Sequence, residues 1–195
     1  NPLALAVPSA TQGPVILDMA TSVVAKGKIF LMGKEGQQTI PPGWALDKDG
    51  NPTTDVQAAL SGMMLPVGGH KGYGLALMVE ILSAVLGGAA FGPHIGLLYG
   101  DFDRGQNVGH CFGALDVSGF GPVEDFLARM DALIAEVRAV PTQPGVSEIL
   151  LPGEVEARCQ ARYAVEGIPF DPAVYAEVNA IAAELGVPPL AALPA

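Results

Sequence analysis

The chain is poor in cysteine and in positive charge. Cys111 and Cys159 are its only cysteines, and they do not form a CxxC pair. Two distant cysteines support neither a disulfide framework nor a structural zinc site, and a reducing cytoplasm fits such a chain best. Ten lysines and arginines stand against twenty acidic residues, which gives a formal net charge of -10. Because a nucleic-acid surface needs clustered cations, this balance argues against one.

Long apolar runs and familiar catalytic signatures are also missing. A membrane span needs about eighteen or more consecutive apolar residues, and Glu80 divides the longest apolar run of this chain. We therefore expect neither a membrane span nor a signal peptide. The sequence has no GxGxxG after a predicted strand, no P-loop, no HExxH and no nucleophile elbow. The histidines His70, His94 and His110 are too dispersed in the sequence to propose a metal centre.

The composition that remains is that of a globular protein. Half of the 195 residues are hydrophobic and 15% are charged, and 25 glycines and 17 prolines are scattered along the chain. The length predicts one domain or two small ones. All five lysines lie at or before Lys71, so a small anionic ligand is expected to bind in the first half of the chain.

Hydrophobic patterning and turn residues predict alternating strands and helices. Strands are expected at 1–8, 14–18, 108–117 and 148–151. Helices are expected from a Thr21 or Ser22 cap to about 32, from a Thr53-Thr54-Asp55 cap to Leu60, at 73–86 and 124–139, from Pro152 onward, and from Asp171 to 185. Val174, Val178, Ile181 and Leu185 are expected to be buried, and Trp44 to anchor a turn-rich loop to the body.

The stretch 65–92, LPVGGHKGYGLALMVEILSAVLGGAAFG, is the most informative one. Four glycines surround the His70-Lys71 pair, and an apolar helix follows. Glycine allows positive φ and close approach of a ligand, and a lysine beside a helix start favours an anion. The loop is therefore a candidate anion site, although the glycines can equally serve packing and turns. The helix is apolar on every face, which is typical of a core or an interface.

Two carboxylates stand at places where a ligand could bind. Asp18 ends a predicted strand and opens the turn DMATS, and Glu154 follows Pro152-Gly153 at a predicted helix start. Either carboxylate can accept hydroxyl or amide donors of a ligand, Glu154 those of nucleotide sugars. Each can instead satisfy backbone N–H groups as a turn or helix cap. The residues alone leave both alternatives open.

Five segments in this order resemble the second type of malate/L-lactate dehydrogenase family, whose fold is not the Rossmann fold. They are NPLALAVP, LDMATSVVAKGKI, the stretch 65–92, GHCFGALD and LPGEVEARCQARYAVEGIP. That family includes sulfolactate and ureidoglycolate dehydrogenases and cyclic-imine reductases. The resemblance covers essentially the whole chain, and its most specific parts are the HKGYGL loop and the DMATS turn.

The resemblance implies an α/β fold with a mixed, largely antiparallel sheet flanked by helices. It also implies an oxidoreductase that uses NAD or NADP and transfers a hydride to or from a small 2-hydroxy or 2-oxo acid, as a homodimer. The implied cofactor contacts are Asp18, Met19, Ala20, His70, Lys71, Pro152, Gly153 and Glu154. We expect residues 1–122 to form the cofactor-binding region and 123–195 a helical region that packs on the same fold.

Two departures from the family bear on function. The family's proton-donating histidine and substrate-binding arginine belong to a segment upstream of the position of Asn1, so no catalytic residue is assigned in this chain, nor any metal ligand. Imine reductases of the family tend to carry an acidic residue where this chain has Lys28, which favours a hydroxy acid. The alternatives are a cyclic-imine reductase and a non-catalytic fragment that binds nucleotide or dimerises.

Overall fold

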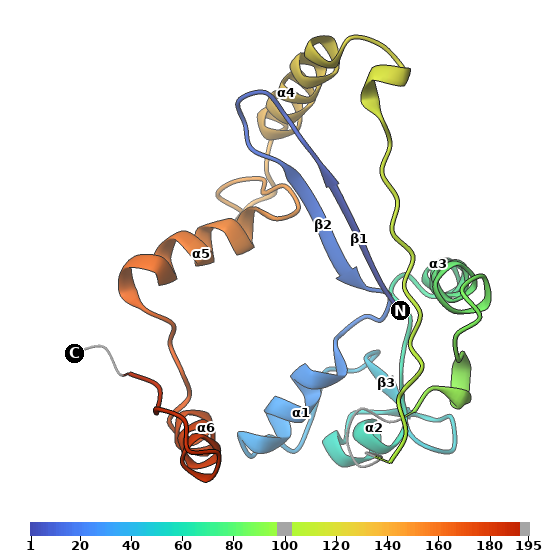
Figure 1. The fold of residues 1–195 in the computed structure, drawn as a ribbon, viewed down its shortest axis with the longest axis vertical. Coiled ribbons are helices and arrows are strands. Elements are labelled where there is room, and N and C mark those ends of the chain that lie inside the picture. The colour runs from blue at the N-terminus through green and yellow to red at the C-terminus, as the bar shows by residue number, and fades with distance from the viewer. Residues whose placement is uncertain (97–102, 192–195) are drawn as a thin grey trace. The chain divides into compact units, whose positions relative to one another are not determined.

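The computed structural model describes residues 1–96 and 103–191, and these form two compact units, 1–131 and 132–195. Figure 1 shows the order of the elements along the chain. The expected division at 122/123 stays a prediction.

The first unit begins with an antiparallel hairpin. Strands β1 (Pro2–Val7) and β2 (Val15–Ala20) pair along their whole length (Figure 1). Both strands were predicted from short apolar runs next to prolines. The loop between them is held by Asp131, whose carboxylate accepts the hydroxyl of Thr11 at 2.7 Å and backbone N–H groups of Ala10 and Thr11.

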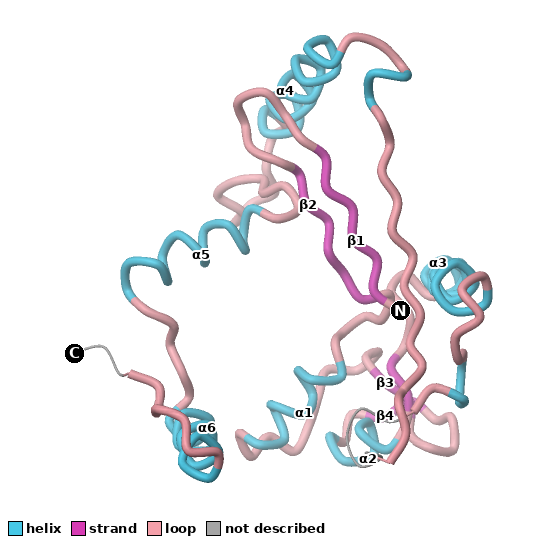
Figure 2. Tube along the Cα trace, in the orientation of Figure 1, coloured by secondary structure: helices cyan, strands magenta, loops and turns pink. Residues whose placement is uncertain are grey.

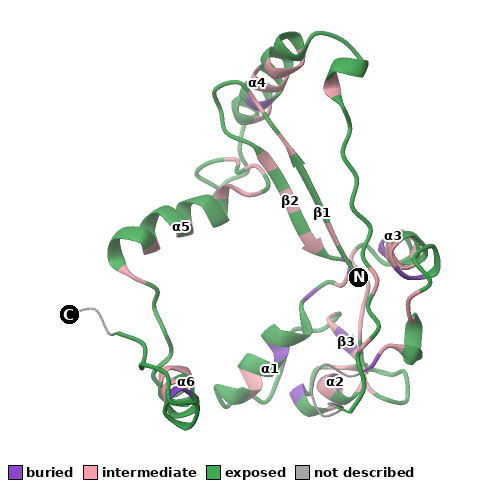
Figure 3. Cartoon of the chain, in the orientation of Figure 1, coloured by how far each residue is buried: buried purple, intermediate pink, exposed green. Residues whose placement is uncertain are grey.

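A small core lies within residues 24–64 of the same unit, where helices and short strands pack together. Its elements are α1 (Lys26–Lys34), β3 (Ala45–Leu46), β4 (Pro52–Thr53), α2 (Val56–Ser61) and β5 (Met63–Met64), with antiparallel strand order β4-β3-β5. The buried hydrophobic residues of this core are Val24, Ile29, Ile40, Ala45, Val56 and Ala59. Figure 3 colours buried residues purple, and such residues lie along α1 and α2. Trp44 packs against this core, which confirms its predicted role as an anchor.

The predicted start of the first helix is wrong, and the predicted start of the second is correct. Helix α1 begins at Lys26, because Thr21 and Val23 are held in extended backbone pairing: the carbonyl of Thr21 accepts from Val67 N–H, and Val23 N–H donates to Leu65. In contrast, Asp55 caps α2 by accepting the N–H of Ala58 at 2.7 Å.

Helix α3 (His70–Glu80) begins three residues before its predicted start and continues as a π-helical turn, η1 (Ile81–Val85). The chain leaves this helix at Gly88, which has a φ of 68°. Of its side chains few are buried, and Leu86, which follows, is 74% exposed. The prediction that this segment lies in a core is wrong within this chain, and the alternative of an interface stays a prediction.

Two predicted strands are absent from the described residues. The segments 108–117 and 148–151 lack ladder partners there, and 109–116 runs as an irregular chain (Figure 2) between two short 3-10 turns, η2 (Gly92–His94) and η3 (Val117–Gly119). A strand needs a neighbour for its backbone hydrogen bonds. Apolar patterning alone does not supply that neighbour.

Three further helices complete the chain, α4 (Val123–Ala139), α5 (Glu154–Glu166) and α6 (Pro172–Glu184). Helix α6 starts where predicted, and Asp171 caps it by accepting N–H groups of Ala173 and Val174. Pro152 lies in the turn before α5 rather than in its first position. The predicted burial of the α6 side chains is wrong for most of them, since Val178, Ile181 and Leu185 are exposed.

The described residues thus form an α/β structure, as predicted. Every strand pair described above is antiparallel. No helix among the described residues has both the length and the apolar character needed to cross a membrane.

Candidate functional site

The structure brings the DMATS turn and the glycine loop side by side in the first unit. Val67 N–H donates to the carbonyl of Thr21 at 2.9 Å, and Val23 N–H donates to the carbonyl of Leu65 at 2.8 Å. Between them, Ser22 and Pro66 form an antiparallel bridge. The end of β2, with Met19 and Ala20, is therefore held next to the residues that lead into α3.

The glycine loop has a backbone that side chains would disturb. Gly68 and Gly69 have φ values of 62° and 63°, in the left-handed region that favours glycine. Gly72 is buried, and a Cβ built on it would lie 1.8 Å from the carbonyl oxygen of Val67. Gly74 has open space around it, so no contact among the described residues requires glycine there.

The start of α3 is suited to an anion. Its cap residue, Gly69, has no side chain to accept the N–H groups of the first turn, and no acidic residue lies in that turn. The positive end of the helix dipole therefore faces outward beside the exposed His70 and Lys71. Together with the left-handed glycines, these donors fit the phosphate groups of a nucleotide cofactor.

Asp18 faces a cavity of about 570 Å³ in the same unit. The walls come from β1, from α3 with η1 and from 108–112, and they are mostly apolar; the ionisable side chains among them are Asp18, Glu80, His110 and Cys111. Glu80 accepts the N–H of Gly92 at 2.8 Å, so one of its oxygens is engaged. A carboxylate beside an apolar wall can orient a hydroxyl or amide group of a ligand.

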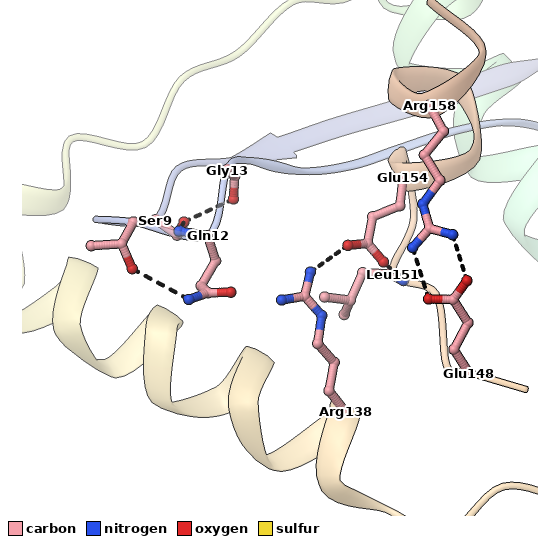
Figure 4. A network of polar contacts seen from close by, with 9 residues as sticks. Ser9, Gln12, Gly13, Arg138, Glu148, Leu151, Glu154 and Arg158 are labelled. Atoms are coloured by element: carbon pink, nitrogen blue, oxygen red, sulfur yellow. Dashed lines mark hydrogen bonds and ion pairs between the residues drawn. The ribbon is translucent and has the colours of Figure 1, made fainter. Parts of the chain in front are cut away.

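The Pro152-Gly153-Glu154 segment lies in the second unit. Gly153 caps α5 with a φ of 93°, and Glu154 opens the helix. The carboxylate of Glu154 accepts the N–H of Leu151 at 2.6 Å and forms an ion pair with Arg138 (Figure 4). The Leu151 N–H lowers the pKa of the Glu154 carboxyl; desolvation opposes this, and Arg138 adds to the lowering.

A second ion pair lies one turn further along α5. Arg158 binds Glu148 with both terminal guanidinium nitrogens, one of them at 2.8 Å (Figure 4). The Arg158 contact holds the pKa of the Glu148 carboxyl below its ordinary value. One acid–arginine pair thus joins the start of α5 to the end of α4, and the other joins α5 to the segment before it.

The predicted site residues fall into two sets. Asp18, Met19, Ala20, His70 and Lys71 lie in the first unit, on two segments that hydrogen-bond to each other. Pro152, Gly153 and Glu154 lie in the second. The sequence did not identify three residues that lie at these sites. Glu80 and His110 line the cavity, and Arg138 pairs with Glu154. Arg138 is the basic residue of the last turn of α4, and no local pattern ties it to a carboxylate sixteen residues later.

Comparison with known proteins identifies the family. Residues 1–179 match the malate/L-lactate dehydrogenase family. The malate dehydrogenase of Pyrococcus horikoshii is 37% identical over 195 residues, 96% of this chain and 53% of that protein. The L-sulfolactate dehydrogenase of Methanocaldococcus jannaschii is 40% identical over 187 residues, again 96% and 53%. The NAD(+) ureidoglycolate dehydrogenase of Escherichia coli K12 is 37% identical over 175 residues, 90% and 49%.

Solved structures support the same family assignment. The sulfolactate dehydrogenase of M. jannaschii superposes with a TM-score of 0.73 at 35% identity, over 95% of this chain and 52% of that one. A delta1-piperideine-2-carboxylate reductase of Pseudomonas syringae superposes with a TM-score of 0.66 at 30% identity, over 88% and 50%. The chain spans about half the length of the relatives it matches. It belongs to the malate/L-lactate dehydrogenase family.

Proposed function

We propose that the polypeptide carrying this chain is an NAD(P)-dependent dehydrogenase of a small 2-hydroxy acid, of the malate, lactate, sulfolactate or ureidoglycolate type. The observation that carries the proposal is the pairing of 21–23 with 65–67. This pairing joins two segments for which the family predicts cofactor contacts. Membership of the family supports the reaction class.

In this proposal the residues of the chain bind and orient the cofactor. Lys71 and the N–H groups at the start of α3 hold phosphate oxygens, for which the glycine loop leaves room. Asp18 and Glu154 accept hydroxyl or amide donors. Met19 and Ala20, at the end of β2, complete the contact surface. The nicotinamide ring, when bound, supplies or accepts the hydride.

Proton transfer is not assigned to the histidines of this chain. His70 is proposed as a cofactor contact, and His94 and His110 are given no catalytic role. The acid–base group is left unassigned among residues 1–195. Binding in a fixed orientation is then the main contribution of this chain to the reaction rate.

A cyclic-imine reductase is the second candidate, because the Pseudomonas reductase has a similar fold. Lys28 favours the hydroxy acid, and its ammonium lies 5.6 Å from the centre of the Trp44 ring, a cation–π contact that fixes the charge beside the core. The substrate in the name of that reductase also carries a carboxylate, so the preference drawn from Lys28 rests on the family resemblance.

The test is a substrate comparison on the full-length polypeptide. Oxidation of malate, lactate, sulfolactate and ureidoglycolate with NAD and with NADP is compared with reduction of a cyclic imine. We expect turnover of at least one hydroxy acid. Turnover of the imine alone would replace this proposal by the reductase, and absence of both cofactor binding and turnover would leave a non-catalytic protein.

We also propose that the protein is a cytoplasmic homodimer. The free thiols Cys111 and Cys159 suit a reducing compartment. Exposed apolar side chains on α3 and η1, among them Met78 and Val85, suit an interface between two copies.

A further inference from the structure

The carboxylate of Glu154 is held at two points in the second unit (Figure 4). One oxygen accepts the N–H of Leu151 at 2.6 Å, which folds the side chain back over the turn before α5. The other oxygen pairs with a guanidinium nitrogen of Arg138, at the end of α4. Two contacts on different oxygens fix both the position and the plane of a carboxylate.

This carboxylate can still be reached by a ligand. The Glu154 side chain is 23% exposed and the Arg138 side chain 38%. An ionised carboxylate offers about four acceptor positions on its two oxygens. The two contacts described use one position on each oxygen, which leaves one on each for donors of a bound molecule.

Arg138, and not Arg158, is the partner of this carboxylate. Arg158 lies four residues after Glu154 on α5, a spacing at which side chains can meet. Both of its terminal nitrogens instead bind Glu148, at 2.5 and 2.8 Å. Glu154 is thus hydrogen-bonded to the arginine that comes from a different helix, while the charge of Arg158 also lowers the pKa of Glu154.

We propose that Arg138 is a positioning residue for Glu154: it holds the carboxylate in the one orientation from which Glu154 can accept a hydroxyl group of the nicotinamide cofactor. The inference rests on the proposed function for the identity of the ligand. Arg138 itself acts through Glu154 and is not placed in contact with the cofactor.

The physical basis is the cost of ordering a long side chain. A free glutamate loses rotamer freedom when it binds a ligand, and this loss weakens the binding. In this chain the Arg138 contact and the Leu151 N–H have already fixed the rotamer. Removal of Arg138 should therefore weaken cofactor binding about three- to tenfold, although the residue that meets the cofactor is unchanged.

The experiment compares Arg138→Gln, Arg138→Lys and Arg129→Gln with the parent protein. Arg129 is an exposed arginine on the same helix, so its replacement removes the same charge without touching Glu154. Dissociation constants for NADH and NADPH are measured by fluorescence titration of the full-length polypeptide. The pKa of the Glu154 carboxyl is measured by NMR in the absence of cofactor.

We expect Arg138→Gln to weaken cofactor binding and to raise the pKa of Glu154 toward its ordinary value, Arg138→Lys to restore part of both, and Arg129→Gln to change neither. An unchanged pKa of Glu154 in Arg138→Gln would overturn the inference, as would an altered pKa with unchanged cofactor affinity. If the parent binds no nicotinamide cofactor, the proposed function fails, and the NMR measurement still decides whether Arg138 orients Glu154.

Discussion

Gly72 is the residue at which the loop before α3 leaves no room for a side chain. A methyl group there would lie 1.8 Å from the carbonyl oxygen of Val67, a backbone atom that cannot move without shifting the loop. We predict that Gly72→Ala destabilises the protein by about 1–3 kcal/mol, the usual range for overpacking, and weakens cofactor binding.

The control is Gly74→Ala in the same helix. Nothing lies within 4 Å of a Cβ at that position, so alanine should keep or raise stability by up to about 1 kcal/mol through its helix propensity. Thermal unfolding and cofactor titration measure both variants. Equal stability of the two would contradict the steric account of Gly72.

Lys71 is the one lysine beside the start of α3, and it is exposed. If it binds a phosphate, Lys71→Met should weaken cofactor binding about ten- to hundredfold, the usual value of a hydrogen bond to a charged group, and should leave the melting temperature nearly unchanged. The loss should shrink at high salt, because exposed charges are screened. Lys48→Met, in an exposed turn, is the control. Unchanged affinity in Lys71→Met would count against the phosphate assignment.

At the scale of elements, Asp131 joins α4 to the turn between β1 and β2. The hydroxyl of Thr11 lowers the pKa of the Asp131 carboxyl; desolvation opposes this, and N–H groups of Thr11 and Ala10 add to the lowering. A lowered pKa means that the contact stabilises the folded state above the ordinary carboxyl pKa. This stabilisation is lost as the pH falls through the lowered value.

We therefore predict that the N–H groups of Ala10 and Thr11 are protected from hydrogen exchange at neutral pH and lose protection in acid. In Asp131→Asn the protection should be low at every pH, because an amide is a weaker acceptor than a carboxylate. Asp125→Asn, on the same helix, should behave like the parent. An unaltered protection profile in Asp131→Asn would show that the turn is held by other contacts.

Local signals predicted some elements well and others not at all. The Asp55 and Asp171 caps were readable because each accepts N–H groups within three residues along the chain. The strand at 108–117 was not, because a strand depends on a partner that its own sequence does not name. Thr21 and Ser22 look like helix caps, but pairing with 65–67 holds them extended. The sequence therefore predicted which segments form the candidate site. It did not predict the hydrogen bonds that hold those segments together, because these bonds join residues far apart in the chain.

At the scale of the whole molecule, the exposed surface of α3 and η1 is the least expected feature. Met78 and Val85 are 49% and 54% exposed, and Leu86 after them is 74% exposed. Large contiguous apolar patches are rare on monomers and often mark interfaces. A net charge of -10 keeps separate copies apart, so association has to come from burial of such a surface.

The proposed homodimer is tested on this face. We predict that the parent protein sediments as a dimer and that Met78→Arg combined with Val85→Arg sediments as a monomer, because two charges would be buried without partners. The control is Val165→Arg on α5, whose side chain is 85% exposed. Circular dichroism checks that the helices persist in each variant. A monomeric parent, or a double variant that remains dimeric, would show that this face is not the dimer interface. If Val165→Arg dissociates the dimer equally, the effect comes from added charge in general and not from this face.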